Sequence, residues 1–299
     1  MSDECLRTPV NEMIELEPQL VAQDFMFLEA PKWHQGLLWL SDVFDHKVYA
    51  LTAEGQRRRV FDVPNRPSGL GFLADGTLII VSAKDCRLLR LDGDKLSEYA
   101  DLSNHATGWL NDFAVDPQDR IYVGNFGYDF VAGEPRKPTW LHRVDPGGTV
   151  VTVADNIDFP NGSVVINEGR TLIVAETWEG RLTAFDIDVA GNLGNRRTFA
   201  DLGSRQPDGI CADVQGAIWV GICNTGEFVR VLDGGEITHR FKFAGSGISC
   251  TLGGGDGSTL FATAFIGTDD DMAAGKRNSA IFKVEVDVSS PDTAGVQAR

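Results

Sequence analysis

A pattern of short β-strands recurs six times along this chain of 299 residues at intervals of 39 to 50 residues, and this period constrains the fold more than any other feature. Each copy contains a short apolar run bounded by Gly, Asp or Asn, which is typical of a strand between tight turns. A strand that opens with a small or polar residue precedes each run. The openings are Glu29, Ser68, Asn111, Asn161, Asp208 and Ser249. Amphipathic helix patterns are nearly absent, so we expect an all-β fold.

Further strands complete each copy. Residues 47–51 and 181–185 are examples of a third strand, and the more polar residues 58–61 of a fourth. Six four-stranded copies at this period predict a six-bladed β-propeller. The last copy shows only three strands, so we expect residues 14–17 to supply its outer strand and close the ring, which leaves no open sheet edge. We assign residues 1–299 to a single propeller domain whose core spans about residues 14–288.

The composition limits the kinds of partner. A formal net charge of −16 and a pI near 4.7 oppose binding to nucleic acid or to an anionic membrane surface. No apolar run reaches the roughly 18 residues that span a bilayer, and residues 1–15 lack the apolar segment of a signal peptide. The five cysteines are odd in number and irregularly spaced, which indicates reduced thiols. We expect a cytoplasmic protein, monomeric or weakly self-associating, that acts on a small molecule.

The first strand of each propeller blade lines the central channel, so the six openings are expected to form a ring near one mouth. Four of them, Glu29, Asn111, Asn161 and Asp208, carry carboxylate or carboxamide oxygens. Oxygen ligands suit calcium or magnesium and tolerate manganese or zinc, and two carboxylates match the charge of one divalent ion. The alternative is that Asn, Asp and Gly simply form turns at strand starts.

Several stretches are individually weak as motifs but specific in combination: residues 28–33, 110–112, 115–117, 159–162, 175–177, 207–210 and 250–254. With them the chain resembles the senescence marker protein/gluconolactonase/luciferin-regenerating enzyme family (regucalcin-like) over about residues 16–286. The resemblance implies a six-bladed propeller that hydrolyses lactones with one divalent ion, whether calcium, zinc, manganese, magnesium or iron. It implies Glu29, Asn161 and Asp208 as metal ligands, with Asn111 as a direct or near ligand. Related propellers hydrolyse organophosphates.

Two positions bear on the substrate. Sugar-lactone members of the family carry an arginine two residues before the Asn of the Asn–Asp pair, where this chain has Trp109. An arginine fork would hydrogen-bond sugar hydroxyls, whereas an indole offers an apolar face and one donor. We therefore expect a substrate less polar than a sugar lactone. A second substrate-contacting acid of the family falls at Asp129, so Trp109, Asn111 and Asp129 are the expected substrate contacts.

Asp208 and Asn111 are the expected catalytic residues. The resemblance places Asp208 at the metal with one oxygen free to act as a base, although the residue can equally be a ligand only, and Asn111 should orient the substrate. No Gly-x-Ser-x-Gly stretch is present, which argues against a serine hydrolase. Two other functions stay open, a propeller that binds calcium or a small ligand without turnover and a phosphotriesterase on the same site. Residues 253–257 indicate a turn in the last blade, and residues 269–271 a solvated loop.

Overall fold

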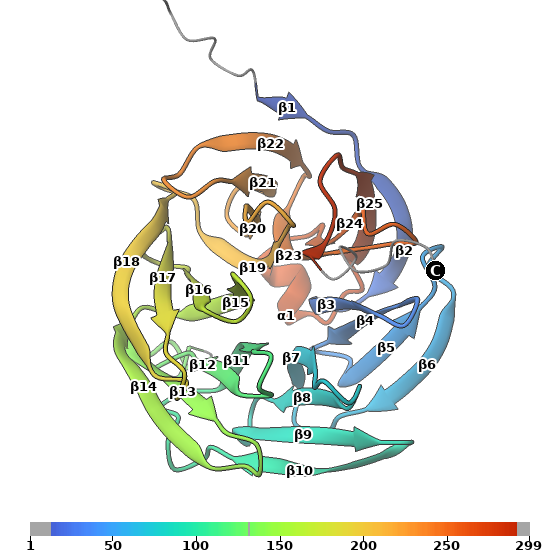
Figure 1. Cartoon of the computed structure of the whole chain (residues 1–299). Helices are drawn as coiled ribbons and strands as arrows, with labels where there is room; N and C mark the ends of the chain where they lie inside the picture. Colours follow the sequence, from blue (N-terminus) through green and yellow to red (C-terminus); the bar gives the residue numbers. More distant parts are fainter. Residues whose placement is uncertain (1–12, 131, 292–299) are drawn as a thin grey trace, which may run out of the picture.

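The computed structural model describes residues 13–130 and 132–291, which form six sheets around a central axis, five of four strands and one of five (Figure 1). This confirms the six-bladed propeller. Blades one to three consist of β3 (Leu28–His34), β4 (Leu37–Asp42), β5 (Lys47–Leu51) and β6 (Arg57–Asp62); β7 (Pro67–Phe72), β8 (Leu78–Ser82), β9 (Arg87–Asp92) and β10 (Lys95–Asp101); and β11 (Leu110–Val115), β12 (Ile121–Asn125), β13 (Thr139–Val144) and β14 (Val150–Ile157).

Blades four to six follow in the same order. They consist of β15 (Pro160–Ile166), β16 (Thr171–Glu176), β17 (Arg181–Ile187) and β18 (Leu193–Asp201); β19 (Pro207–Ala212), β20 (Ile218–Ile222), β21 (Glu227–Val231) and β22 (Ile237–Lys242); and β23 (Ser246–Gly253), β24 (Thr259–Phe265), β25 (Ser279–Glu285) and β2 (Gln19–Phe25). Strand β1 (Ile14–Glu15) lies outside β22.

An N-terminal strand closes the ring, as expected, but it is not the expected one. Strand β2 pairs antiparallel with β25 and completes blade six, whereas Ile14–Glu15 adds a short parallel strand to blade five. Pro18 separates the two segments, and a proline cannot donate to a sheet ladder. Phe25 at the end of β2 is buried against the core, whereas Glu15 on β1 pairs with Arg240 at the surface.

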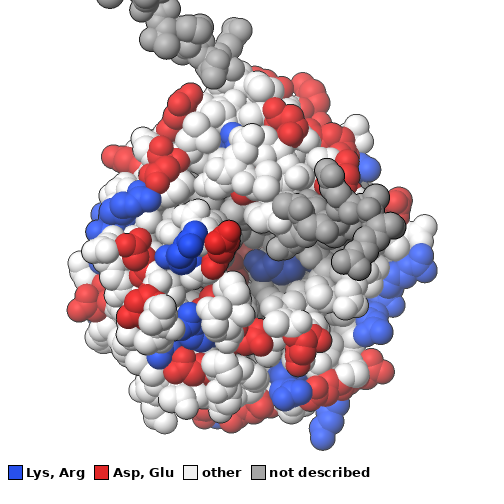
Figure 2. Space-filling model, viewed as in Figure 1, with Lys and Arg blue, Asp and Glu red and all other residues white. Residues whose placement is uncertain are grey.

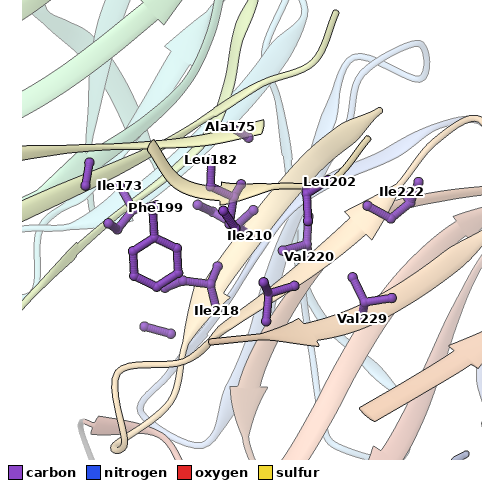
Figure 3. Close-up of a cluster of buried hydrophobic side chains, with 14 residues drawn as sticks. Ile173, Ala175, Leu182, Phe199, Leu202, Ile210, Ile218, Val220, Ile222 and Val229 are labelled. Carbon is purple, nitrogen blue, oxygen red and sulfur yellow. The ribbon is translucent and has the colours of Figure 1, made fainter. Parts of the chain in front are cut away.

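The hydrophobic core lies between the blades. Each of six clusters of buried apolar side chains joins one blade to the next around the ring. Figure 3 shows the cluster between blades four and five, where Phe199 and Ile173 meet Ile210 and Ile218. Because every blade packs against two neighbours, the axial ends of the first strands are held at fixed positions, and these strands carry the candidate site.

The acidic run at residues 269–271 does not form a loop, as the sequence suggested, but begins helix α1 (Asp269–Ala273) between β24 and β25. The side chain of Thr268 accepts a hydrogen bond from the backbone N–H of Asp271, whose carboxylate accepts one from the Thr268 N–H. This capping box and three acidic residues in the first turn favour a helix start. In the part of the chain that the structure describes, no helix is long and apolar enough to cross a bilayer.

Candidate functional site

The predicted opening residues lie where the first strand of a blade departs from regular pairing. In blade three, Leu110 pairs with Asn125 and the next pair is Phe113 with Val123, so Asn111 and Asp112 form a bulge. Blades one, two, four and five break their ladders near the same point. Bulges re-aim side chains and are frequent beside active sites. The repeat thus places a polar side chain from each of blades one to five near the same level of the channel.

The sixth member of the predicted ring is displaced by one residue. A Cβ atom added to Gly209 would lie 1.9 Å from the Oγ atom of Ser249, so Ser249 shares its layer with Gly209 rather than with Asp208. Ile248 therefore stands where the other blades present Asp208 and its counterparts. Ser249 exchanges hydrogen bonds with Thr263 and is a packing residue of blade six.

Asn111 is held from both sides by the neighbouring blades. Its Nδ2 donates to the carbonyl oxygen of Pro160 at 3.2 Å, and its Oδ1 accepts from the Oγ of Ser68 at 3.4 Å. An amide oxygen has two lone pairs. One acceptor position of Asn111 is therefore left for a ligand, while one N–H of its amide is bound to the fold.

Asn161 is oriented in the same way. Its Nδ2 lies 3.2 Å from the Oγ1 of Thr177, which in turn donates to the carbonyl oxygen of Pro207 at 2.8 Å. Asn161 also hydrogen-bonds Asp208, an interaction that lowers the pKa of that carboxyl. The predicted residues Asn161 and Asp208 are thus in direct contact.

Three carboxyl groups meet in this layer: Glu29, Asp208 and Asp112. Burial raises the pKa of Glu29 well above its usual range, and the charges of Asp208 and Asp112 raise it further. Burial likewise raises the pKa of Asp208 to about 8, against the lowering effect of Asn161 and with a contribution from Asp112. Burial also raises the pKa of Asp112, while Lys32 deeper in the channel opposes that shift.

Asp112 was not singled out from the sequence. It follows Asn111 directly, and in a regular strand two consecutive side chains point to opposite faces. The bulge brings both into the channel layer. The Asn–Asp pair itself was the only available signal, because no other opening places an acid directly after its polar residue.

The carboxyl groups of this site have no basic partner among the described residues and favour the binding of a cation. The Oδ1 atom of Asp208 is buried and has no hydrogen-bond partner. In the described ranges, no Lys or Arg forms an ion pair within 4 Å with any of the three carboxyl groups. Buried carboxylates without a partner are costly, and a divalent ion relieves both the burial and their repulsion.

Glu29 and Asp208 with the amide oxygens of Asn161 and Asn111 make an all-oxygen donor set suited to such an ion. The described residues hold no group of three or more His, Cys, Asp and Glu side chains spaced to share one metal. The donor set does not select among calcium, magnesium, manganese, zinc and iron.

Aromatic side chains surround this end of the channel. Trp109 and Phe159 stand two residues before Asn111 and Asn161, and Phe126 links them, with ring centroids 6.2 Å from Trp109 and 4.7 Å from Phe159. Trp178 continues the cluster at 5.0 Å from Phe159, and Phe130 remains 48% exposed. A substrate at the ring therefore meets apolar aromatic surface.

Asp129 is not brought to the ring. Its side chain is exposed, and its Oδ1 accepts a hydrogen bond from the backbone N–H of Ala132, which stabilises its own loop. Its charge contributes to none of the pKa shifts of the ring carboxyls. The role of Asp129 as a substrate contact stays a prediction.

The opposite end of the channel is a separate space. A cavity of about 360 Å³ is lined by the far halves of the first strands and by Lys32, Ser290 and Pro291. Figure 2 views the molecule along the axis and shows a hollow at the centre with a basic side chain inside it. Lys32 lines this cavity and is also near enough to Asp112 and Glu29 to lower their pKa values.

A family model described as the SMP-30/gluconolactonase/LRE-like region matches residues 27–266, which include all four candidate metal ligands. The chain belongs to this family. The SMP-30/gluconolactonase/LRE-like proteins include lactonases, and the match covers the first strands of all six blades.

Three relatives indicate the breadth of the family. Regucalcin of Danio rerio is 30% identical over 189 residues, which make up 60% of this chain and 62% of that protein, so the chain spans somewhat under two thirds of its length in that alignment. Pentonolactonase XacC of Haloferax volcanii is 28% identical over 276 residues, covering 86% of this chain and 90% of the relative. The structure of a calcium-binding protein, regucalcin from Agrobacterium tumefaciens, superposes with a TM-score of 0.79 at 22% identity, covering 93% of this chain and 96% of that one.

Proposed function

We propose that this SMP-30/gluconolactonase/LRE-like protein is a metal-dependent lactonase whose substrate is less polar than a sugar lactone. The observation that carries the proposal is the buried, unpartnered Oδ1 atom of Asp208 between two further carboxyl groups and two oriented amides. A propeller that only presents a binding surface has no need of such a group. The relative XacC, a pentonolactonase, supports hydrolysis of a cyclic ester.

Each residue of the site has a distinct role in the proposed hydrolysis. Glu29, Asn161 and Asp208 would hold a divalent ion, which would supply Lewis-acid polarisation of the lactone carbonyl. Asp208 takes a proton from the attacking water, whose oxygen adds to the carbonyl carbon. When the ring C–O bond breaks, the same proton passes to the leaving alkoxide, and a hydroxy acid is released. Asn111, whose side chain is hydrogen-bonded to Pro160 and Ser68, orients the substrate beside Asp208.

The aromatic cluster supports the substrate class. Trp109 stands where sugar-lactone members of the family carry an arginine, and Phe126 and Phe159 extend its apolar surface. Ring faces gain free energy from apolar contact and cannot satisfy several hydroxyl groups. An aliphatic or aromatic lactone loses fewer hydrogen bonds than a polyhydroxy lactone on entering this site.

A lactone panel with a pH indicator tests the proposal. Sugar, aliphatic and aromatic lactones are each assayed with a chelator and with added calcium, manganese or zinc. We expect metal-dependent acid release with a higher kcat/KM for dihydrocoumarin than for gluconolactone. Absence of acid release from every lactone with every metal would reject the lactonase and favour a calcium- or ligand-binding propeller, and a preference for gluconolactone would reject the substrate class alone.

The role of Asp208 needs a separate measurement, because a base and a ligand both lose turnover on substitution. In Asp208→Asn, metal content is measured alongside kcat. A variant that retains its metal and loses turnover supports the base. A variant that loses both supports a ligand role only.

A further inference from the structure

An arginine without a carboxylate partner lies beside Trp109. The guanidinium carbon of Arg66 stands 5.0 Å from the centroid of the Trp109 ring and 4.9 Å from that of Phe44, so the group is held between two aromatic faces. The Nε atom of Arg66 is buried and has no hydrogen-bond partner. Most other arginines in the described ranges pair with an acid, including Arg120, which reaches Asp116 at 2.6 Å.

The position of Arg66 relates it to the candidate site. Arg66 stands two residues before Ser68, just as Trp109 stands two residues before Asn111, and the Oγ of Ser68 donates to Asn111. Both residues therefore occupy the same place in adjacent blades, one step outside the ring. The backbone also joins them, because Ala83 donates its N–H to the Arg66 carbonyl and accepts from the N–H of Leu110.

The acid of the neighbouring turn is already engaged. Asp85 accepts hydrogen bonds from Asn65 and Ser82 and forms an ion pair with Arg87. No acid raises the pKa of Arg66, and burial lowers it. The Nζ of Lys84 lies 5.7 Å from the centroid of the same Trp109 ring, which adds a second cation on this side of the mouth. Arg66 and Lys84 are thus two cationic side chains without an acidic partner in the described part of the chain, at the entrance to an acidic channel. In a chain of net charge −16, such a pair attracts an anion to this place.

We propose that Arg66 is a substrate-binding residue that holds a carboxylate carried by the lactone beside its ring. A planar guanidinium clamped between two rings keeps its N–H edge oriented at little entropic cost, which suits two-point binding of a carboxylate. The inference rests on the proposed lactonase function and narrows its substrate to an anionic lactone with an apolar body. The aromatic rings contact the apolar part of the lactone, and Arg66 binds its carboxylate.

Two matched pairs of compounds separate this inference from the lactonase itself. The first pair, 5-oxotetrahydrofuran-2-carboxylate and its carboxamide, reports turnover. The second pair, the lactams 5-oxopyrrolidine-2-carboxylate and its carboxamide, reports binding by calorimetry to the metal-loaded protein without requiring hydrolysis. For the wild type we expect the carboxylate of each pair to be preferred, in kcat/KM and in Kd, by on the order of 10- to 100-fold.

Arg66→Met keeps an apolar stem between the rings and removes the fork, so the preference should fall below about threefold. Arg57→Met is the matched control, because Arg57 stacks in the same way on Phe25 and Tyr49, at 4.9 and 4.8 Å, on an outer strand. It removes the same charge and should retain the preference. Arg66→Gln is a second variant that also removes the guanidinium, and a melting curve for each variant shows whether it is folded.

Equal affinity of the wild type for both lactams would overturn the inference, as would a preference that survives in both Arg66 variants, since the carboxylate would then bind elsewhere. If lactones are hydrolysed without a preference for the carboxylate, the lactonase stands and Arg66 has no such role. If the lactam carboxylate is preferred and no lactone is hydrolysed, the anion site stands and the lactonase fails.

Discussion

Removal of the Asp208 carboxylate should stabilise the metal-free protein at neutral pH while reducing its stabilisation by metal. Burial raises the pKa of Asp208 from 3.8 to about 8 in the folded chain. Between those two values the folded state holds a proton that the unfolded state does not. The free energy of unfolding therefore falls as the pH rises, until the folded carboxyl also ionises near pH 8. The stability that the raised pKa provides at low pH is lost across this window.

The size of the effect follows from the same pKa values. Each pH unit within the window changes the free energy of unfolding by on the order of 1 kcal/mol. Raising the pH from 5 to 7 should thus cost the wild type about 3 kcal/mol, or a fall of about 5 °C in Tm for a chain of this size. Asp208→Asn cannot ionise, so with chelator present its Tm should depend less on pH and exceed that of the wild type at pH 8.

With saturating metal the wild type should instead melt above Asp208→Asn. An ion that binds only the folded state, at a concentration one hundred times its Kd, adds about 3 kcal/mol to the free energy of unfolding of the wild type. Glu176→Gln is the control. Burial tends to raise the Glu176 pKa, but hydrogen bonds from Arg181 and Thr183 bring it below its usual value. That variant should therefore lose stability at pH 8. Thermal melts at pH 5, 7 and 8, with chelator or metal, make the comparison, and an Asp208→Asn that melts below the wild type at pH 8 in chelator would refute this account.

Three further outcomes are expected. Glu29→Gln should weaken calcium or manganese binding in calorimetry by at least about tenfold, since it removes one of two anionic donors; an unchanged Kd would exclude Glu29 as a ligand. Trp109→Arg should shift the kcat/KM ratio between gluconolactone and dihydrocoumarin toward the sugar lactone by about 1–3 kcal/mol, and no shift on replacing Trp109 by Arg or Ala would show that the ring does not contact substrate. Phe25→Ala should lower the free energy of unfolding by about 3–5 kcal/mol, because Phe25 is 1% exposed in the closing strand, whereas Leu20→Ala in the same strand, where Leu20 is 53% exposed, should change it little in denaturant titrations.

The propeller and its ring of polar openings could be read from the sequence because each blade repeats the same turn chemistry at the same place. The positions of Ser249 and Asp112 were not predicted from the sequence, because both lie where the structure departs locally from that repeat. Ser249 was assigned one residue out of register because blade six carries Ile248 at the ring, and an apolar residue gives no motif. Asp112 lies in the channel only because of a bulge, which strand periodicity cannot anticipate.

Other features depend on contacts between distant parts of the chain. Strand β2 rather than residues 14–17 closes the ring because of its pairing with β25 and the burial of Phe25, and neither segment has a stronger strand pattern than the other. Arg66 is isolated in the sequence from both Phe44 and Trp109, and only the packing of adjacent blades places its guanidinium between their rings.

The pairing of β2 with β25 has a consequence for synthesis. Residues 19–25 are made before blades one to five, but their partners at residues 279–285 are made after them, so β2 has no strand to pair with while those blades emerge. At 5 to 20 residues per second, roughly a quarter of a minute to a minute passes before the ring can close. During that time five blades can assemble as an open arc whose two end blades expose the apolar faces that blade six would cover. A ribosome stalled before residue 279 would release such an arc, and its exposed apolar faces make it a substrate for chaperones or proteases rather than a smaller working protein.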